Sequence, residues 1–212
     1  MTSTPAVRAT GRPDDPAFAA LLPAWRATPG DPGLRAALTE LAQDGHPAAA
    51  CALAHLAFEG IGAPANPGAA FLWALRGAHG GFAAAAAMAG DFYLHSEPEH
   101  RTCVRLVGRA LPWHELAARA GHARAAFATS DSYRMGRGCE RDFQRAYCFL
   151  LVGIRCAERV PAIVDVLLPS LRSDLIEARS DAIEAEVAAI LEGLPRIDAD
   201  LDRYWSSLAT AV

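Results

Sequence analysis

The sequence contains no lysine, so all 20 of its basic side chains are arginine. Only 8% of its 212 residues are aromatic, and its five cysteines include no CxxC pair. An odd number of scattered cysteines is atypical of a disulfide framework or a structural zinc site. We therefore predict buried, reduced thiols and a protein without a metal or another cofactor.

Long apolar runs are missing as well. No uncharged run reaches the roughly 18 residues of a membrane span, and the first residues lack the apolar core of a secretory signal. These two absences favour a cytoplasmic protein that makes no contact with a membrane. Alanine is abundant instead, at 47 positions, and this composition favours closely packed helices.

Catalytic motifs are also absent from the sequence. It holds no G-x-S-x-G, phosphate-binding loop or HExxH, and its carboxylates form no recognisable acid–base pair. Residues 95–100 combine two histidines with two glutamates, which keeps one enzymatic hypothesis open, a metal-dependent hydrolase. A solvated acidic loop is the simpler interpretation. We therefore predict no catalytic residue, no metal ligand and no enzymatic activity.

An internal repeat organises the chain. Two segments match without a gap at a spacing of 76 residues. Each begins with Gly-His, continues with Gly-x-Gly and ends with an alanine and an aromatic residue three positions later. These features begin at Gly45, Gly60 and Ala70 in one segment and at Gly121, Gly136 and Ala146 in the other. A weaker copy begins at Gly81 and has four extra residues between about His95 and Arg109.

The residues of the first copy predict two helices. Residues 47–59 have helical periodicity that ends at Gly60, because glycine accepts the left-handed backbone of a helix end. A second helix follows Asn66, whose side chain suits an N-cap. Its buried side is predicted at Ala70, Leu72 and Trp73. A single helix pair cannot bury both of its faces, so we expect the pairs to stack.

These residues and their order resemble the Sel-one-like repeat, a relative of the tetratricopeptide repeat. The resemblance covers residues 45–157 and implies an all-α fold. That fold is an α/α solenoid of about three stacked helix-turn-helix repeats, at 45–80, 81–120 and 121–157. N- and C-terminal capping helices flank the repeats.

The flanks are assigned from their turn and helix signals. Residues 1–13 are predicted to be a flexible tail. The N-terminal caps fall within 14–44, with helices at about 16–28 and from Asp31-Pro32 to about 44. The C-terminal caps fall within 158–212, with helices at about 173–191 and 198–208.

Charge is distributed unevenly along the chain. Residues 1–100 carry 5 arginines and 9 acids, residues 101–159 carry 11 and 5, and residues 160–212 carry 4 and 10. The basic middle either meets an acidic partner or is neutralised by the acidic C-terminal part. It includes a secondary basic patch at Arg101, Arg105 and Arg109. No aromatic platform accompanies this patch, so we do not expect nucleic acid as its partner.

The resemblance implies that the first helix of each pair carries the residues that bind a partner. Positions opposite the predicted core combine apolar side chains with polar ones, a mixture that suits a protein surface. They are Cys51, His55, Phe58, Asp91, Leu94, Phe127, Asp131 and Arg134. The sequence leaves one alternative open, in which the flanking helices cover part of this stripe.

The resulting functional prediction is a non-catalytic adaptor, chaperone or regulator. It would bind another protein or a peptide on the concave face of the solenoid, as a monomer or weak homodimer. A cytoplasmic immunity protein that inhibits a bacterial toxin is the alternative within the same class.

Overall fold

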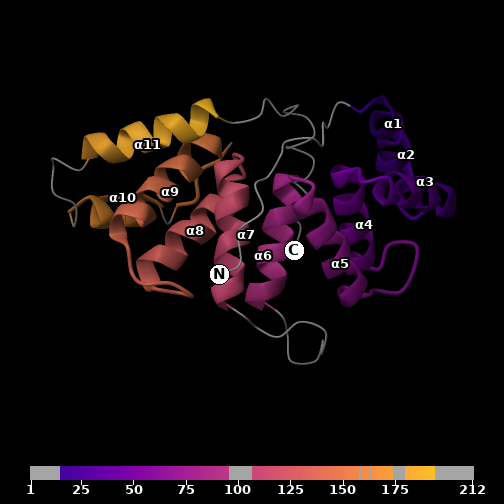
Figure 1. The fold of residues 1–212 in the computed structure, drawn as a ribbon, viewed down its shortest axis with the longest axis horizontal. Helices are drawn as coiled ribbons and strands as arrows, with labels where there is room; N and C mark the ends of the chain where they lie inside the picture. The colour runs from indigo at the N-terminus through magenta and orange to yellow at the C-terminus, as the bar shows by residue number, and fades with distance from the viewer. Residues whose placement is uncertain (1–14, 96–106, 158, 163, 174–179, 194–212) are drawn as a thin grey trace. The chain divides into compact units, whose positions relative to one another are not determined.

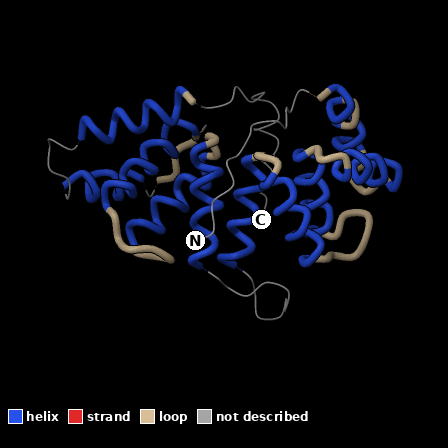
Figure 2. The backbone as a smooth tube through the Cα atoms, viewed as in Figure 1, coloured by secondary structure: helices blue, strands red, loops and turns tan. Residues whose placement is uncertain are grey.

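The computed structural model describes residues 15–95, 107–157, 159–162, 164–173 and 180–193 (Figure 1). These residues form helices, turns and loops, and no strand occurs among them (Figure 2). The predicted all-α class is thus confirmed. The chain divides into two compact units, and the boundary falls inside one helix, between Ala89 and Gly90. Unit 1 here means the described residues up to 89, and unit 2 those from 90 onward.

Unit 1 contains the N-terminal flank and the first helix pair. Its helices are α1 (Pro16–Ala19), α2 (Leu22–Ala27), α3 (Pro32–Gln43), α4 (Pro47–Glu59), α5 (Pro67–His79) and the first part of α6 (Ala83–His95). Helix α4 packs between α3 and α5. The helix predicted at 47–59 is confirmed. The predicted N-cap is confirmed too, because Asn66 Oδ1 accepts the amide of Ala69 at 3.0 Å.

Unit 2 contains the rest of α6, the later helices and the C-terminal flank. These helices are α7 (Val107–Arg119), α8 (Ala123–Met135), α9 (Phe143–Cys156), α10 (Val164–Ser173) and α11 (Ser180–Glu192). Helix α8 packs between α7 and α9, and both α10 and α11 pack on α9. Pairs α4–α5, α6–α7 and α8–α9 fall within the three predicted repeat ranges. The outer limits of the predicted domains remain predictions.

The turns of the first and third helix pairs have the same backbone geometry, 76 residues apart. Gly60 and Gly136 end α4 and α8 with φ of 69° and 70°, in the left-handed region. The next N-cap amide then donates back to the first helix, from Asn66 to the carbonyl of Ala57 (2.7 Å) and from Asp142 to that of Tyr133 (3.0 Å). The same hydrogen bond therefore closes both turns.

The flanking helices differ from the prediction in two ways. The single helix predicted at 16–28 is divided into α1 and α2, because Pro23 in the first turn of α2 has no amide to continue an earlier helix. The helix predicted at about 173–191 is described as α11 from Ser180 onward, and its predicted first part at 174–179 lies outside the described residues. The sequence analysis missed α10, which contains Pro169, a residue that usually disrupts a helix interior. The predicted tail at 1–13 and helix at 198–208 lie outside the described residues.

The core of unit 1 is built mainly from small residues. Helix α5 buries Ala70, Ala74, Gly77 and Ala78. Leu72 is 67% exposed, so the prediction that it is buried is wrong. Two residues along a helix correspond to roughly 200° of rotation, which places Leu72 opposite Ala70. Trp73, the other residue predicted on this side, is only partly buried.

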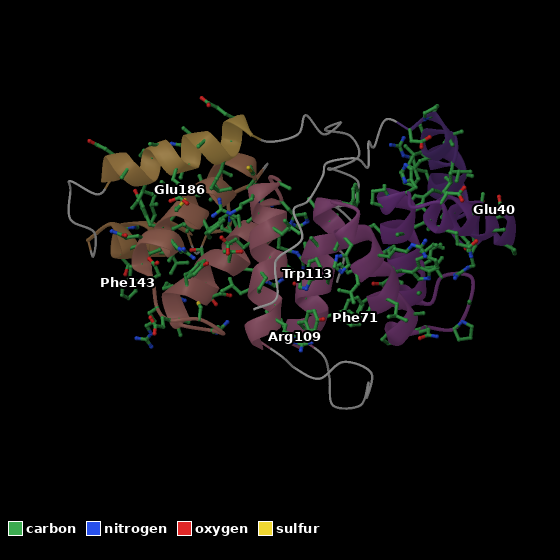
Figure 3. All side chains as sticks on the ribbon, in the orientation of Figure 1. Glu40, Phe71, Arg109, Trp113, Phe143 and Glu186 are labelled. Atoms are coloured by element: carbon green, nitrogen blue, oxygen red, sulfur yellow. The ribbon has the colours of Figure 1, made fainter. Side chains whose placement is uncertain are left out.

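The acidic helix α11 neutralises part of the basic middle of the chain. Glu184 pairs with Arg155 of α9 at 2.6 Å, and Glu186 lies 3.8 Å from Arg119 of α7. Glu186 is labelled on α11 in Figure 3. For these two arginines, the structure confirms the alternative in which the C-terminal part neutralises the basic segment.

We predict that Gly60→Ala destabilises the protein by about 1–2 kcal/mol, because a side chain at φ 69° is strained. The added Cβ would also lie 3.0 Å from the amide nitrogen of Ala65. Urea denaturation measures this loss. The control is Gly108→Ala in α7, where the nearest atom to an added Cβ is 3.8 Å away. Equal destabilisation by both substitutions would contradict a specific role for the left-handed turn.

Candidate partner-binding surface

The N-terminal flank and the core cover part of the predicted stripe on α4. Cys51 is 2% exposed, and burial raises the pKa of its thiol to about 12, so its side chain belongs to the core. The ring of His55 lies 6.3 Å from that of Trp25 on α2, and burial lowers the pKa of this histidine. Phe58 is 43% exposed. Of these three predicted contacts, only Phe58 remains largely accessible.

In unit 2, the predicted residue Asp91 joins a polar cluster between three helices. Its Oδ1 lies 3.1 Å from Nε2 of the buried His114 on α7, and its Oδ2 pairs with Arg124 on α8. A Cβ atom at Gly90 would overlap the His114 ring, so the glycine allows this close approach. Leu94, one turn further along α6, is half-buried. Asp91 thus links the end of α6 to both following helices.

A second charged group lies at the C-terminal end of α8. Asp131 accepts hydrogen bonds from Arg134 Nη2 at 2.5 Å and from Arg137 Nη1 at 2.7 Å. Two guanidinium groups around one carboxylate leave a net positive charge. The structure therefore brings together two of the predicted residues, Asp131 and Arg134, and adds Arg137 from the following turn.

Phe127 faces the neighbouring helix more than the solvent. Its half-buried ring packs against the core of unit 2. A Cβ atom at Gly153 of α9 would lie only 2.8 Å from this ring. The predicted role of Phe127 as an apolar contact is therefore limited to the exposed part of its ring.

Equivalent positions of α4 and α8 carry different kinds of side chain. At the repeat spacing of 76 residues, His55 corresponds to Asp131 and Phe58 to Arg134. The cap residue Trp25 lies beside the first of these positions, whereas Asp131 and Arg134 are about one-third exposed. We name the polar group of unit 2 the α8 surface. It consists of Asp91, Arg124, Asp131, Arg134 and Arg137.

Two histidines at equivalent repeat positions cap their helices. Nδ1 of His46 accepts the amide of Ala49, and Nδ1 of His122 accepts the amide of Ala125, both at 3.2 Å. The histidine of each Gly-His motif therefore serves as an N-cap. Burial, reinforced by the nearby charge of Arg124, lowers the pKa of His122 to about 4. The neutral imidazole that the cap requires is therefore the stable form at neutral pH.

Sequence reasoning missed a network that joins α7, α8 and α9. The hydroxyl of Tyr133 donates to Glu115 Oε2 at 3.1 Å and accepts from Arg145 Nη1 at 2.8 Å. The Arg145 guanidinium also lies 5.3 Å from the centre of the Tyr133 ring. Tyr133 is part of the repeat motif, but its partners come from helices that periodicity alone does not bring together.

The remaining predicted groups are only partly described. Arg109 is exposed on α7 (Figure 3), whereas Arg101 and Arg105 lie outside the described residues. The side chains of residues 95–100 also lie outside them.

Among the described residues, no three histidine, cysteine or carboxylate side chains gather as a metal site. Cys51, Cys139 and Cys148 are free thiols. No described helix has both the length and the apolar character of a membrane span.

The chain matches no protein-family model and no curated protein sequence. A solved Sel1 repeat protein from Oxalobacter formigenes is similar, with a TM-score of 0.63 and 23% identity over 73% of this chain and 44% of that one. A protective antigen of uropathogenic Escherichia coli strains with the same repeat fold aligns at a TM-score of 0.40 and 20% identity, over 82% and 44%. The first match confirms the predicted Sel1-like repeat fold. The chain spans less than half the length of either protein.

We predict that Asp91→Ala destabilises the protein by about 1–3 kcal/mol, because the substitution leaves the buried Nε2 of His114 without its partner. Arg124→Ala is the matched control. It removes an ion pair whose arginine is 54% exposed and should cost less than about 1 kcal/mol. Chemical denaturation of both variants measures the difference. Equal losses would show that His114 does not depend on Asp91.

The His122 cap makes stability depend on pH. The unfolded chain binds a proton on this imidazole below pH 6.5, whereas the folded chain binds it only near pH 4. Stability is therefore lost as the pH falls through this interval, by about 2 kcal/mol between pH 7 and pH 5. His122→Asn keeps a capping side chain and should lose less stability over the same range. Denaturation at both pH values tests this, and identical losses would contradict it.

Proposed function

We propose that this chain is a non-catalytic module that binds an acidic segment of another protein through its α8 surface. The observation that carries the proposal is that two equivalent helices, α4 and α8, differ in how much of their surface is buried by neighbouring helices. Helix α4 is buried around almost its whole circumference, whereas α8 keeps Arg124 exposed and Asp131 and Arg134 partly exposed. In a repeat protein, function depends on such exposed side chains, because the scaffold itself is shared by many functions.

The arginines of the α8 surface are accessible and already ordered. Arg124 and Arg137 are 54% and 52% exposed, and each is held by an aspartate of the same surface. A side chain that is held in place before binding loses less rotamer freedom when a partner arrives. A guanidinium can bind a carboxylate through two parallel hydrogen bonds. This chemistry supports an acidic partner.

Charge distribution supports the same partner chemistry. Residues 101–159 carry 11 arginines against 5 acids. Among the described residues, the ion pairs of α11 reach α7 and α9 but not α8. The C-terminal flank thus leaves the arginines of the α8 surface paired only with the two aspartates of that surface, Asp91 and Asp131. A positive surface raises the rate at which acidic proteins associate with it.

The proposal also includes the location, the oligomeric state and the class of partner that the sequence predicts. The module acts in the cytoplasm, as a monomer or weak homodimer, and without a membrane or nucleic acid. In the narrower version, the bound protein is a bacterial toxin and the chain is its immunity protein. Restored growth of cells that express the captured protein would distinguish this version from a general adaptor.

The test is affinity capture of partners from native lysate, followed by a binding titration with the captured protein. Arg124→Glu and Arg137→Glu should each weaken binding by about tenfold or more, because each reverses one charge at the surface. The matched control is Arg159→Glu, which makes the same charge change at an exposed residue outside the helices. Circular dichroism confirms that all the variants are folded.

Three outcomes bear on the proposal. Loss of binding in the two α8 variants but not in Arg159→Glu supports it. Equal binding by all variants would move the interface away from α8. Equal loss in all three would indicate a nonspecific response to net charge, and it would also overturn the proposal.

A further inference from the structure

The outward side of α5 carries an exposed stripe at helical spacing. It consists of Leu72, Leu75, Arg76 and His79, and we name it the α5 stripe. Leu72 is the most exposed large apolar residue among the described positions. Leu75 is half-buried, and the two basic residues that follow are exposed. The Arg76 guanidinium is anchored by the carbonyl of Gln43 at 2.8 Å and lies 5.7 Å from the centre of the Trp73 ring.

The equivalent stripe on α9 is covered. At the repeat spacing of 76 residues it consists of Cys148, Leu151, Val152 and Arg155. The first three of these side chains are buried, and Cys148 is only 1% exposed where Leu72 is 67% exposed. Matching positions of two similar helices therefore have opposite environments.

Helix α11 provides this cover. Its Glu184 pairs with Arg155 at 2.6 Å, at the end of the α9 stripe. Burial, followed by the charges of Glu186 and other carboxylates, raises the pKa of Cys148 to about 12, consistent with acids of α11 near this thiol. The apolar side chains of α11 that enter the core are Ile183, Val187 and Ile190. The α9 stripe thus binds an acidic amphipathic helix. The apolar face of that helix covers Cys148 and Leu151, and its Glu184 pairs with Arg155 at the basic end of the stripe.

A second segment of the same chain has this chemistry. Residues 194–212 follow α11 and lie outside the described residues. Their sequence places Leu201, Tyr204, Trp205 and Leu208 at the i, i+3, i+4, i+7 positions of one helix face. Three acidic residues, Asp198, Asp200 and Asp202, lie near the beginning of this segment and outnumber its two arginines, Arg196 and Arg203. This acidic amphipathic pattern is the one that α11 presents to α9.

We propose that residues 194–212 bind the α5 stripe as α11 binds the stripe of α9. The apolar face of the segment covers Leu72 and Leu75, and its acidic residues meet the basic end of the stripe. The apolar spacing and the carboxylates that this segment shares with α11 are the reasons for choosing it over a second copy or another protein. This interaction does not involve the α8 surface, so its test is independent of the proposed function.

The test is amide hydrogen exchange of the full-length chain, read by mass spectrometry. A docked helix protects its amides, so we expect residues 198–208 to exchange slowly in the wild type. Leu72→Asp should accelerate this exchange by roughly tenfold or more. Because Leu72 is 67% exposed, the substitution should leave the protection of α4 unchanged. The control is Val160→Asp, which changes another exposed apolar residue, in unit 2.

A reciprocal variant tests the other side of the interaction. Trp205→Asp should accelerate exchange of residues 198–208 as Leu72→Asp does, and combining the two should add little further change. Rapid exchange of this segment in the wild type would overturn the proposal, as would equal exchange in wild type and Leu72→Asp. Protection that rises over roughly a hundredfold range of protein concentration would also overturn it, because a second copy would then be the occupant.

Discussion

The turn between the two helices of a repeat is the constraint on which the other features depend. In the first and third repeats, glycine in the left-handed conformation ends the first helix, and an Asn or Asp side chain begins the second. One backbone hydrogen bond, from the N-cap amide to a carbonyl of the first helix, closes each turn. Because this geometry fixes where the second helix starts, it also determines which of its faces meets the first helix.

Close packing follows from the residues on those meeting faces. A Cβ atom at Gly77 would lie 2.8 Å from that of Ala85 and 2.9 Å from the carbonyl of Pro47, so three helices approach one another at this glycine. Small side chains fill little volume, and the helices compensate by lying closer together. A larger side chain enters between paired helices where a glycine makes room for it, as Phe127 of α8 does at Gly153 of α9.

Local signals explain what could be predicted from the sequence. The bounds of α4 and the cap at Asn66 depend on neighbouring residues, so a single pattern contains the necessary information. Exposure depends on segments far away in the chain. Nothing near His55 indicates that Trp25 covers it. The cluster of Asp91 with His114 likewise joins residues 23 positions apart on two helices.

Repeat symmetry explains why the candidate surface was only partly predictable. Equivalent positions have equivalent backbone geometry, but the two flanks cover different sides of their neighbouring pairs. In unit 1, α2 lies over His55 on the first helix of its pair and leaves Leu72 exposed on the second. In unit 2, α11 covers the second helix, α9, and leaves charged residues of the first helix, α8, accessible. A sequence repeat therefore predicts the set of possible surfaces, and the flanks determine which of them remain available for binding.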